Sequence, residues 1–203
     1  MNFIEIYDNA LTPEACKKII DFFDFAPPEI KKEGETYLTK RNLEVESYVD
    51  WISSKGLQVD KKKVKESTDI TMNFNQWTEP NQIIISALRI YTEKYKEKHT
   101  ETENVAGWRL TELYNIQKYE PTQGYHFPHC ECANGDTRRI LAWMIYLNTV
   151  TDKGGTRFTN YDIITDAVEG RLLIWPAYWT HTHHGVASPT QTKYIATGWY
   201  EFK

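Results

Sequence analysis

The sequence predicts a mainly β protein with flanking helices, in which the strands form a double-sheet jelly roll or barrel. Three observations support this expectation. The second half of the chain reads as a series of short strands separated by turn residues. Aromatic residues, which favour strands and pocket walls, make up 14% of the chain. Two stretches in the first half space their apolar residues as a helix does.

Local signals define the first elements. Residues 3–7 read as a short strand, and Asp8-Asn9 as a turn. Thr12 can cap a helix that begins at Pro13, because a hydroxyl accepts from free backbone N–H groups and proline suits the first helical position. Apolar residues then follow helical spacing at Cys16, Ile19, Ile20 and Phe23. We expect this helix to end before Pro27-Pro28.

Residues 28–66 differ from the rest of the chain. They are rich in Lys and Glu and contain few periodic stretches. Charge clusters of this kind usually lie on a solvated surface. We therefore interpret the segment as an exposed connector. The functional alternative is a mobile lid over an active site.

A strand and a second helix come next. Residues 68–75 alternate polar and apolar side chains, which is typical of a strand. Residues 80–98 read as an amphipathic helix. Its apolar face would contain Ile83, Ile84, Leu88, Tyr91 and Tyr95. The Lys-rich end complements the helix dipole.

The remainder of the chain, from residue 106, reads as strands. The expected ranges are 108–119, 125–131, 139–149, 156–158, 163–167, 171–175, 181–187 and 192–202. Eight strands at this spacing are typical of a double-sheet jelly roll or barrel. We expect residues 1–203 to form one domain, with helical support in 1–105 and the jelly-roll core in 106–203.

Composition narrows the class of protein. The formal net charge is −4, which argues against a nucleic-acid partner because such binding needs a basic face. Three cysteines without a C-x-x-C pair offer neither a disulfide framework nor a zinc knuckle. We therefore expect a reducing, cytoplasmic location. We expect no membrane association, since no apolar run approaches about 20 residues.

Five of the six histidines lie within residues 126–184, in two groups. His129 and Glu131 are two apart on one expected strand, so both side chains can point into a barrel interior. A histidine from a facing strand would complete two imidazoles and one carboxylate. That set binds one face of an octahedral ferrous ion and leaves the opposite face open. Strand alternation leaves both His181 and His183 as candidates and directs His184 the other way.

Lys193 is the next unusual residue. It lies ten residues after His183, among apolar and aromatic neighbours on the last expected strand. A lysine buried there needs a partner. The distal carboxylate of a dicarboxylic acid would be one. The alternative is an exposed lysine on an edge strand.

The segment from Tyr119 to Trp199 resembles the catalytic core of the prolyl 4-hydroxylase-like Fe(II)/2-oxoglutarate oxygenases. That family carries H-x-D or H-x-E, a Y-L-N strand, a G-G-x-T-x-F turn and a distal His, with Lys or Arg ten residues later and Trp six beyond. Here the matching sequences are H-C-E at 129–131, Y-L-N at 146–148 and G-G-T-R-F at 154–158, followed by His183, Lys193 and Trp199. The opening T-P-E-A-C helix matches as well, so the resemblance covers nearly the whole chain and is weakest over 28–66.

The resemblance implies a double-stranded β-helix (cupin-like) barrel and a role for each matching residue. His129, Glu131 and His183 would bind Fe(II), and Lys193 would pair with the distal carboxylate of 2-oxoglutarate. The other residues implied for the cosubstrate pocket are Tyr119, Tyr146, Thr156 and Trp199. Dioxygen would be the oxidant, and ascorbate is a candidate further cofactor. The implied reaction hydroxylates an unactivated C–H bond, of a prolyl-type peptide or an amino acid, and releases succinate and CO2.

The chain departs from the commonest family pattern in two respects. Its carboxylate ligand would be Glu131 where Asp is commoner; some phage-encoded members also carry H-x-E. The stretch from Tyr119 to His129 is one residue longer, and the turn before Thr156 one shorter. Tyr119 and Tyr146 have ordinary core packing as their alternative role.

Alternative functions remain beside the oxygenase. One is a non-enzymatic barrel that binds a metal or ligand, with His126 or His181 as a fourth metal ligand. Another is an oxygenase acting on a different small molecule or a nucleobase. Arg138, Arg139 and Arg157 are interpreted as solvated surface, with an acidic substrate as the alternative. The sequence makes no prediction about oligomeric state.

Overall fold

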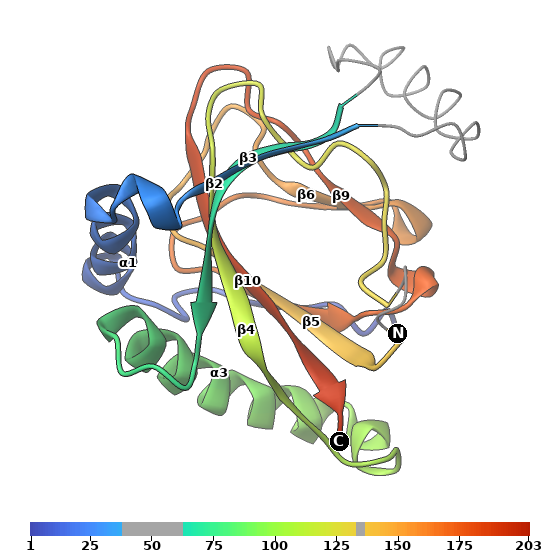
Figure 1. Cartoon of the computed structure of the whole chain (residues 1–203). Helices are drawn as coiled ribbons and strands as arrows, with labels where there is room; N and C mark the ends of the chain where they lie inside the picture. The colour runs from blue at the N-terminus through green and yellow to red at the C-terminus, as the bar shows by residue number, and fades with distance from the viewer. Residues whose placement is uncertain (38–62, 133–136) are drawn as a thin grey trace.

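The computed structural model describes residues 1–37, 63–132 and 137–203, and they form two antiparallel sheets with two helices (Figure 1). Across the larger sheet the order is β1 (Glu5–Tyr7), β8 (Leu172–Pro176), β5 (Arg139–Tyr146), β10 (Lys193–Phe202), β4 (Trp108–Tyr119), β3 (Lys63–Asn73) and β2 (Lys32–Tyr37). The smaller sheet consists of β7 (Ile163–Thr165), β6 (Thr156–Phe158) and β9 (His183–Gly185). The helices are α1 (Pro13–Phe25) and α3 (Glu79–Lys98), with short 3-10 turns η1 (Pro28–Ile30), η2 (Thr100–Glu103), η3 (Thr159–Tyr161) and η4 (Trp179–His181).

The outer face of the larger sheet packs on the two helices (Figure 1). Phe23 from α1 and Leu88 from α3 share one buried cluster with Tyr114, Trp143 and other outward side chains of the sheet. Thr12 caps α1 as expected, with its hydroxyl accepting from the Ala15 N–H at 3.2 Å. The amphipathic patterns of the two helices thus predicted their contacts with the sheet.

The inner face of the larger sheet meets the smaller sheet. A second cluster joins Met144 and Tyr146 of β5 to Phe158 of β6 and Trp175 of β8. Because side chains alternate along a strand, Trp143 faces the helices while its neighbours Ala142 and Met144 face inward. Two facing sheets around an inner cluster confirm the expected double-stranded β-helix.

Two expectations about individual elements were wrong. Residues 32–37 and 63–66 belong to β2 and β3, where part of an exposed connector was expected. Most of the segment 28–66 that was the alternative lid, namely residues 38–62, lies outside the described residues, as does Asn134-Gly135-Asp136. The expected strand 125–131 is irregular, with only isolated bridges at Tyr125 and His129. Pro128 has no N–H for a ladder, which explains the interruption.

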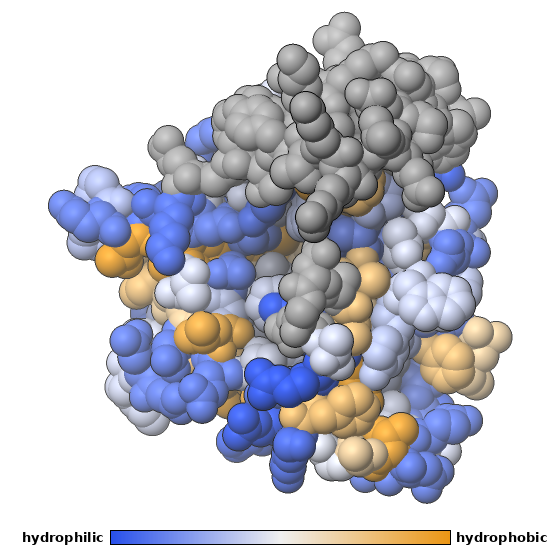
Figure 2. All heavy atoms as spheres, turned by 45° about the vertical axis from the view of Figure 1, so that its right-hand side comes forward, coloured by the Kyte–Doolittle hydropathy of each residue, from blue (hydrophilic) through white to orange (hydrophobic). Residues whose placement is uncertain are grey.

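One coloured face of the molecule mixes hydrophilic and apolar side chains. In the coloured part of Figure 2, hydrophilic side chains predominate and apolar residues form small separate areas. Scattered exposed apolar residues are normal and need no partner. Neither long helix in the described part of the chain is apolar enough to cross a membrane.

The packing of α1 leads to a stability prediction. Phe23 is 1% exposed beneath α1, whereas Phe25 on the same helix is 84% exposed. We expect Phe23→Ala to lower the free energy of unfolding by about 3–5 kcal/mol, because it leaves a cavity between helix and sheet. Phe25→Ala should change it by less than about 0.5 kcal/mol. Denaturant unfolding of both variants measures the difference, and equal effects would contradict this packing.

Candidate active site

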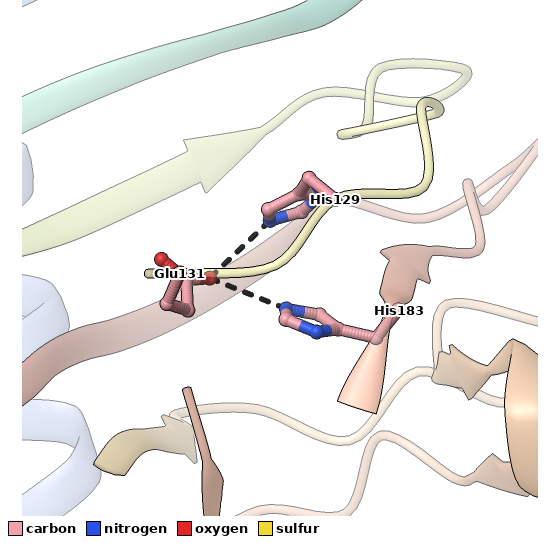
Figure 3. A group of neighbouring side chains, drawn as sticks. All are labelled: His129, Glu131 and His183. Atoms are coloured by element: carbon pink, nitrogen blue, oxygen red, sulfur yellow. Dashed lines mark ion pairs between the residues drawn. The ribbon is translucent and has the colours of Figure 1, made fainter. Parts of the chain in front are cut away.

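Three side chains converge in the space between the sheets (Figure 3). The Nε2 atoms of His129 and His183 lie 3.3 Å and 3.2 Å from the same oxygen, Oε1 of Glu131. All three candidate ligand atoms lie within 4.8 Å of one another. Two imidazole nitrogens and a carboxylate oxygen so placed could hold one transition-metal ion, because this donor set suits ferrous iron.

Backbone hydrogen bonds fix these three positions. His129 and His183 form an antiparallel bridge, in which each N–H donates to the other's carbonyl, at 2.9 Å and 3.0 Å. The Glu131 N–H donates to the carbonyl of Ala177 at 2.9 Å. The Tyr125 ring stacks on the His129 ring with centroids 3.7 Å apart. The site therefore depends on bridges between the irregular segment and neighbouring chain.

Both imidazoles are held in the tautomer that binds metal through Nε2. The Nδ1 of His129 lies 2.9 Å from the carbonyl of Phe127, and the Nδ1 of His183 lies 2.9 Å from the carbonyl of His181. A carbonyl can only accept, so each Nδ1 carries the hydrogen. Each Nε2 then faces Glu131, to which it donates when the ring is protonated, and it is the atom that can bind a metal when the ring is neutral.

The charge states of the site also suit a cation. Burial opposes ionisation of Glu131, but hydrogen bonds and positive charge from the two histidines hold its pKa well below the usual range. Burial lowers the pKa of His183, and the charge of His129 lowers it further. The set is therefore ready to present an anionic carboxylate and a neutral imidazole at neutral pH.

A cavity of about 170 Å3 opens beside these residues. It has room for a small molecule, since a water takes up about 30 Å3 in the liquid. Its walls include the three candidate ligands, Tyr119, Thr156, Lys193 and Trp199. Four of the side chains come from alternate residues of β10, namely Lys193, Ile195, Thr197 and Trp199.

Lys193 is a buried cation in this cavity. It is 4% exposed, and its Nζ donates to the carbonyl of Gly154 at 2.9 Å. None of the ion pairs among the described residues includes Lys193, and burial lowers its pKa to about 8. A buried ammonium without an anionic partner is costly, so the position favours a bound carboxylate. This geometry rules out the exposed edge-strand alternative.

The two tyrosines implied for the pocket occupy different layers. The Tyr119 hydroxyl donates to Oε1 of Gln117 at 2.7 Å, because the Gln117 amide nitrogen donates to Asp69 at 3.0 Å. The Tyr119 ring faces the cavity, 5.0 Å from Nζ of Lys193. Tyr146 lies behind the wall, and its hydroxyl is 2.7 Å from that of Thr156. Tyr119 is therefore a wall residue, and Tyr146 supports Thr156.

The other histidines lie outside the three-residue cluster. His181 belongs to η4, so the strand alternation assumed for it does not apply; its ring Nε2 lies 2.7 Å from the carbonyl of Asn2. His126 and His184 are both buried. His184 lies beside Arg157 in the pairing of β9 with β6, while His183 pairs with Phe158. Strand alternation correctly predicted that His184 points away from the three-residue cluster. Its side chain is buried in the protein and does not face solvent.

Sequence reasoning missed Arg139. Its Nη1 lies 3.6 Å from Oε2 of Glu131, and its guanidinium lies 3.7 Å from the centroid of the Trp199 ring. The interpretation as solvated surface was therefore wrong for Arg139. Its side chain is only 23% exposed. Its position directly before the apolar run of β5 was the available signal.

The part of the chain that contains these residues is similar to a known protein family. Residues 114–201 match the family model described as the 2OG-Fe(II) oxygenase superfamily. The matched range contains the three candidate ligands and Lys193. Enzymes of this superfamily use Fe(II), 2-oxoglutarate and dioxygen. No curated protein sequence gives a match.

Solved structures share the fold over the whole chain. A Pseudomonas putida prolyl-4-hydroxylase is 14% identical with a TM-score of 0.62, over 100% of this chain and 94% of that one. The viral collagen prolyl hydroxylase of Paramecium Bursaria Chlorella virus-1, in a 2OG complex, is 16% identical with a TM-score of 0.58, over 100% and 97%. A Trichoplax adhaerens prolyl hydroxylase is 14% identical with a TM-score of 0.53, over 93% and 90%. Together, the match of residues 114–201 to the superfamily model and the shared fold support a 2-oxoglutarate-dependent Fe(II) oxygenase that resembles the prolyl 4-hydroxylases.

Proposed function

We propose that this enzyme hydroxylates an unactivated C–H bond of a peptide, prolyl by analogy, with iron held by His129, Glu131 and His183. The carrying observation is that one cavity contains this ligand set and the buried Lys193. The ligand set would bind the metal, and Lys193 would bind an anionic cosubstrate. A non-enzymatic barrel would need the metal set without the carboxylate anchor.

The three ligands would bind the metal with their present hydrogen bonds intact. Backbone carbonyls hold both Nδ1 atoms, so the two Nε2 atoms and Oε1 of Glu131 remain for the ion. Bound Fe(II) supplies the dioxygen and one-electron chemistry that protein side chains lack. With three protein ligands, positions remain for the cosubstrate.

Lys193 would anchor the distal carboxylate of 2-oxoglutarate. Its ammonium can exchange the neutral carbonyl of Gly154 for a charged acceptor, which makes a stronger hydrogen bond. The Thr156 hydroxyl lies in the same wall, oriented from behind by Tyr146. The Tyr119 ring closes the side of the pocket and excludes water from the ammonium.

A peptide substrate is supported by the names of two structural neighbours. One is a viral collagen prolyl hydroxylase, and another was solved in complex with a hypoxia inducible factor peptide fragment. The acidic net charge of −4 disfavours a nucleic-acid substrate. The substrate would enter from the part of the cavity lined by Asn115 and Thr197, which lies four residues along β10 from Lys193.

Turnover tests the proposal. The protein is incubated with Fe(II), 2-oxoglutarate, ascorbate and a peptide panel that includes proline-rich sequences. We expect succinate and a peptide product heavier by one oxygen atom, both measured by mass spectrometry. Glu131→Ala should abolish both, because it removes the anionic ligand. The exposed Glu103→Ala is the matched control and should retain turnover. Activity retained in Glu131→Ala would refute the ligand assignment.

A separate prediction concerns Lys193 and pH. Burial places its pKa near 8, so the ammonium is charged below that pH and neutral above it. Binding of a dicarboxylate needs the charged form. We therefore expect the KM for 2-oxoglutarate to rise as pH increases above about 8, approaching about tenfold per unit. Lys193→Met should raise the KM at pH 7 by about tenfold or more and remove this pH dependence. A KM unchanged by the substitution would exclude Lys193 as the anchor.

A further inference from the structure

The two carboxylate oxygens of Glu131 have different partners. Oε1 faces the Nε2 atoms of His129 and His183. Oε2 accepts a hydrogen bond of 2.7 Å from the indole Nε1 of Trp199. The Nη1 of Arg139 lies 3.6 Å from Oε2 and donates to the Glu131 carbonyl at 3.2 Å. Arg139 thus contacts both the backbone and the side chain of Glu131.

Trp199 and Arg139 also hold each other. The guanidinium lies 3.7 Å from the centroid of the indole ring, within the range of a cation–π contact. They come from neighbouring strands, β10 and β5, at an irregular register between Tyr200 and Glu201. Glu131 is therefore held by two donors that are themselves fixed on the rigid sheet.

We infer that Trp199 and Arg139 are positioning residues that retain Oε2 of Glu131 and leave Oε1 alone to bind the metal. This inference rests on the proposed function. A carboxylate can bind a metal through both oxygens and then take up a second coordination position. A glutamate has one more rotatable bond than an aspartate, so it has more ways to do this. The Trp199 hydrogen bond and the nearby Arg139 charge compete with the metal for Oε2 and keep a position open for the cosubstrate.

The neighbouring arginine provides an internal comparison. Arg138 precedes Arg139 in the chain, but its side chain is 67% exposed and pairs with Glu201 at 3.2 Å. It carries the same charge next to the same strand, but its ion pair among the described residues is with Glu201 and not with Glu131. Removing Arg138 therefore controls for the loss of one positive charge near the site.

The test measures metal binding without turnover. Metal-free protein is titrated with Mn(II), followed by electron paramagnetic resonance, and with Co(II), followed by visible absorption. Trp199→Phe removes the N–H donor while keeping a ring, and Arg139→Ala removes the cation. We expect both to weaken Mn(II) binding by about ten- to a hundred-fold, because Glu131 loses its fixed orientation, and to alter the Co(II) spectrum, because Oε2 is then free to bind the metal. Arg138→Ala should change the affinity by less than about twofold.

The outcomes separate this inference from the proposed function. If wild type and Glu131→Ala bind Mn(II) equally, the proposed ligand set is wrong. If wild type binds through Glu131, but Trp199→Phe and Arg139→Ala bind with unchanged affinity and spectrum, the ligand set stands and the positioning role is refuted. A purely structural role would lower the melting temperature of the metal-free variants and leave metal affinity unchanged, which also refutes it.

Discussion

The antiparallel bridge between His129 and His183 is the contact on which the site depends. Two backbone hydrogen bonds join an irregular segment to the first residue of β9. They bring two imidazoles from residues more than fifty positions apart to one carboxylate. Backbone bonds do not depend on side-chain identity, so the frame of the site can exist before any metal binds. The Nδ1 contacts to carbonyls then set the tautomer of each ring.

The two faces of the larger sheet have different roles, one in stability and one in the active site. Its outer face packs against α1 and α3 through apolar side chains, and its inner face supplies the cavity wall. On β10 the change is residue by residue: Ala196 faces the helices, whereas Lys193 and Thr197 face the cavity. A strand fixed by an apolar outer face can place polar inner groups without contributing mobile loops to the site.

Strong periodic patterns predicted most of the fold, and the family resemblance named the three residues that the structure brings together as a candidate metal site. The helices and β4 follow directly from such patterns. The segment 125–131 did not, because Pro128 interrupts pairing and long-range bridges replace the ladder. Arg139 was missed for a related reason: its partner, Oε2 of Glu131, lies across the fold. Periodic patterns along the chain predict which face of a strand or helix a side chain occupies. They do not predict which distant residue that side chain contacts.

The charges of the metal site and of Lys193, which line the same cavity, are linked energetically. Glu131 alone cannot balance a divalent ion together with the ammonium of Lys193 in a buried space. A dicarboxylate brings two negative charges, one group for each positive centre. Each ligand would therefore lower the cost of binding the other, and by linkage this coupling is reciprocal. The low pKa of Lys193 in the protein alone has the same physical origin, since the ammonium is buried before its partner arrives. The proposed orientation of Glu131 would matter for this coupling, because it would leave a coordination position at the metal for the dicarboxylate.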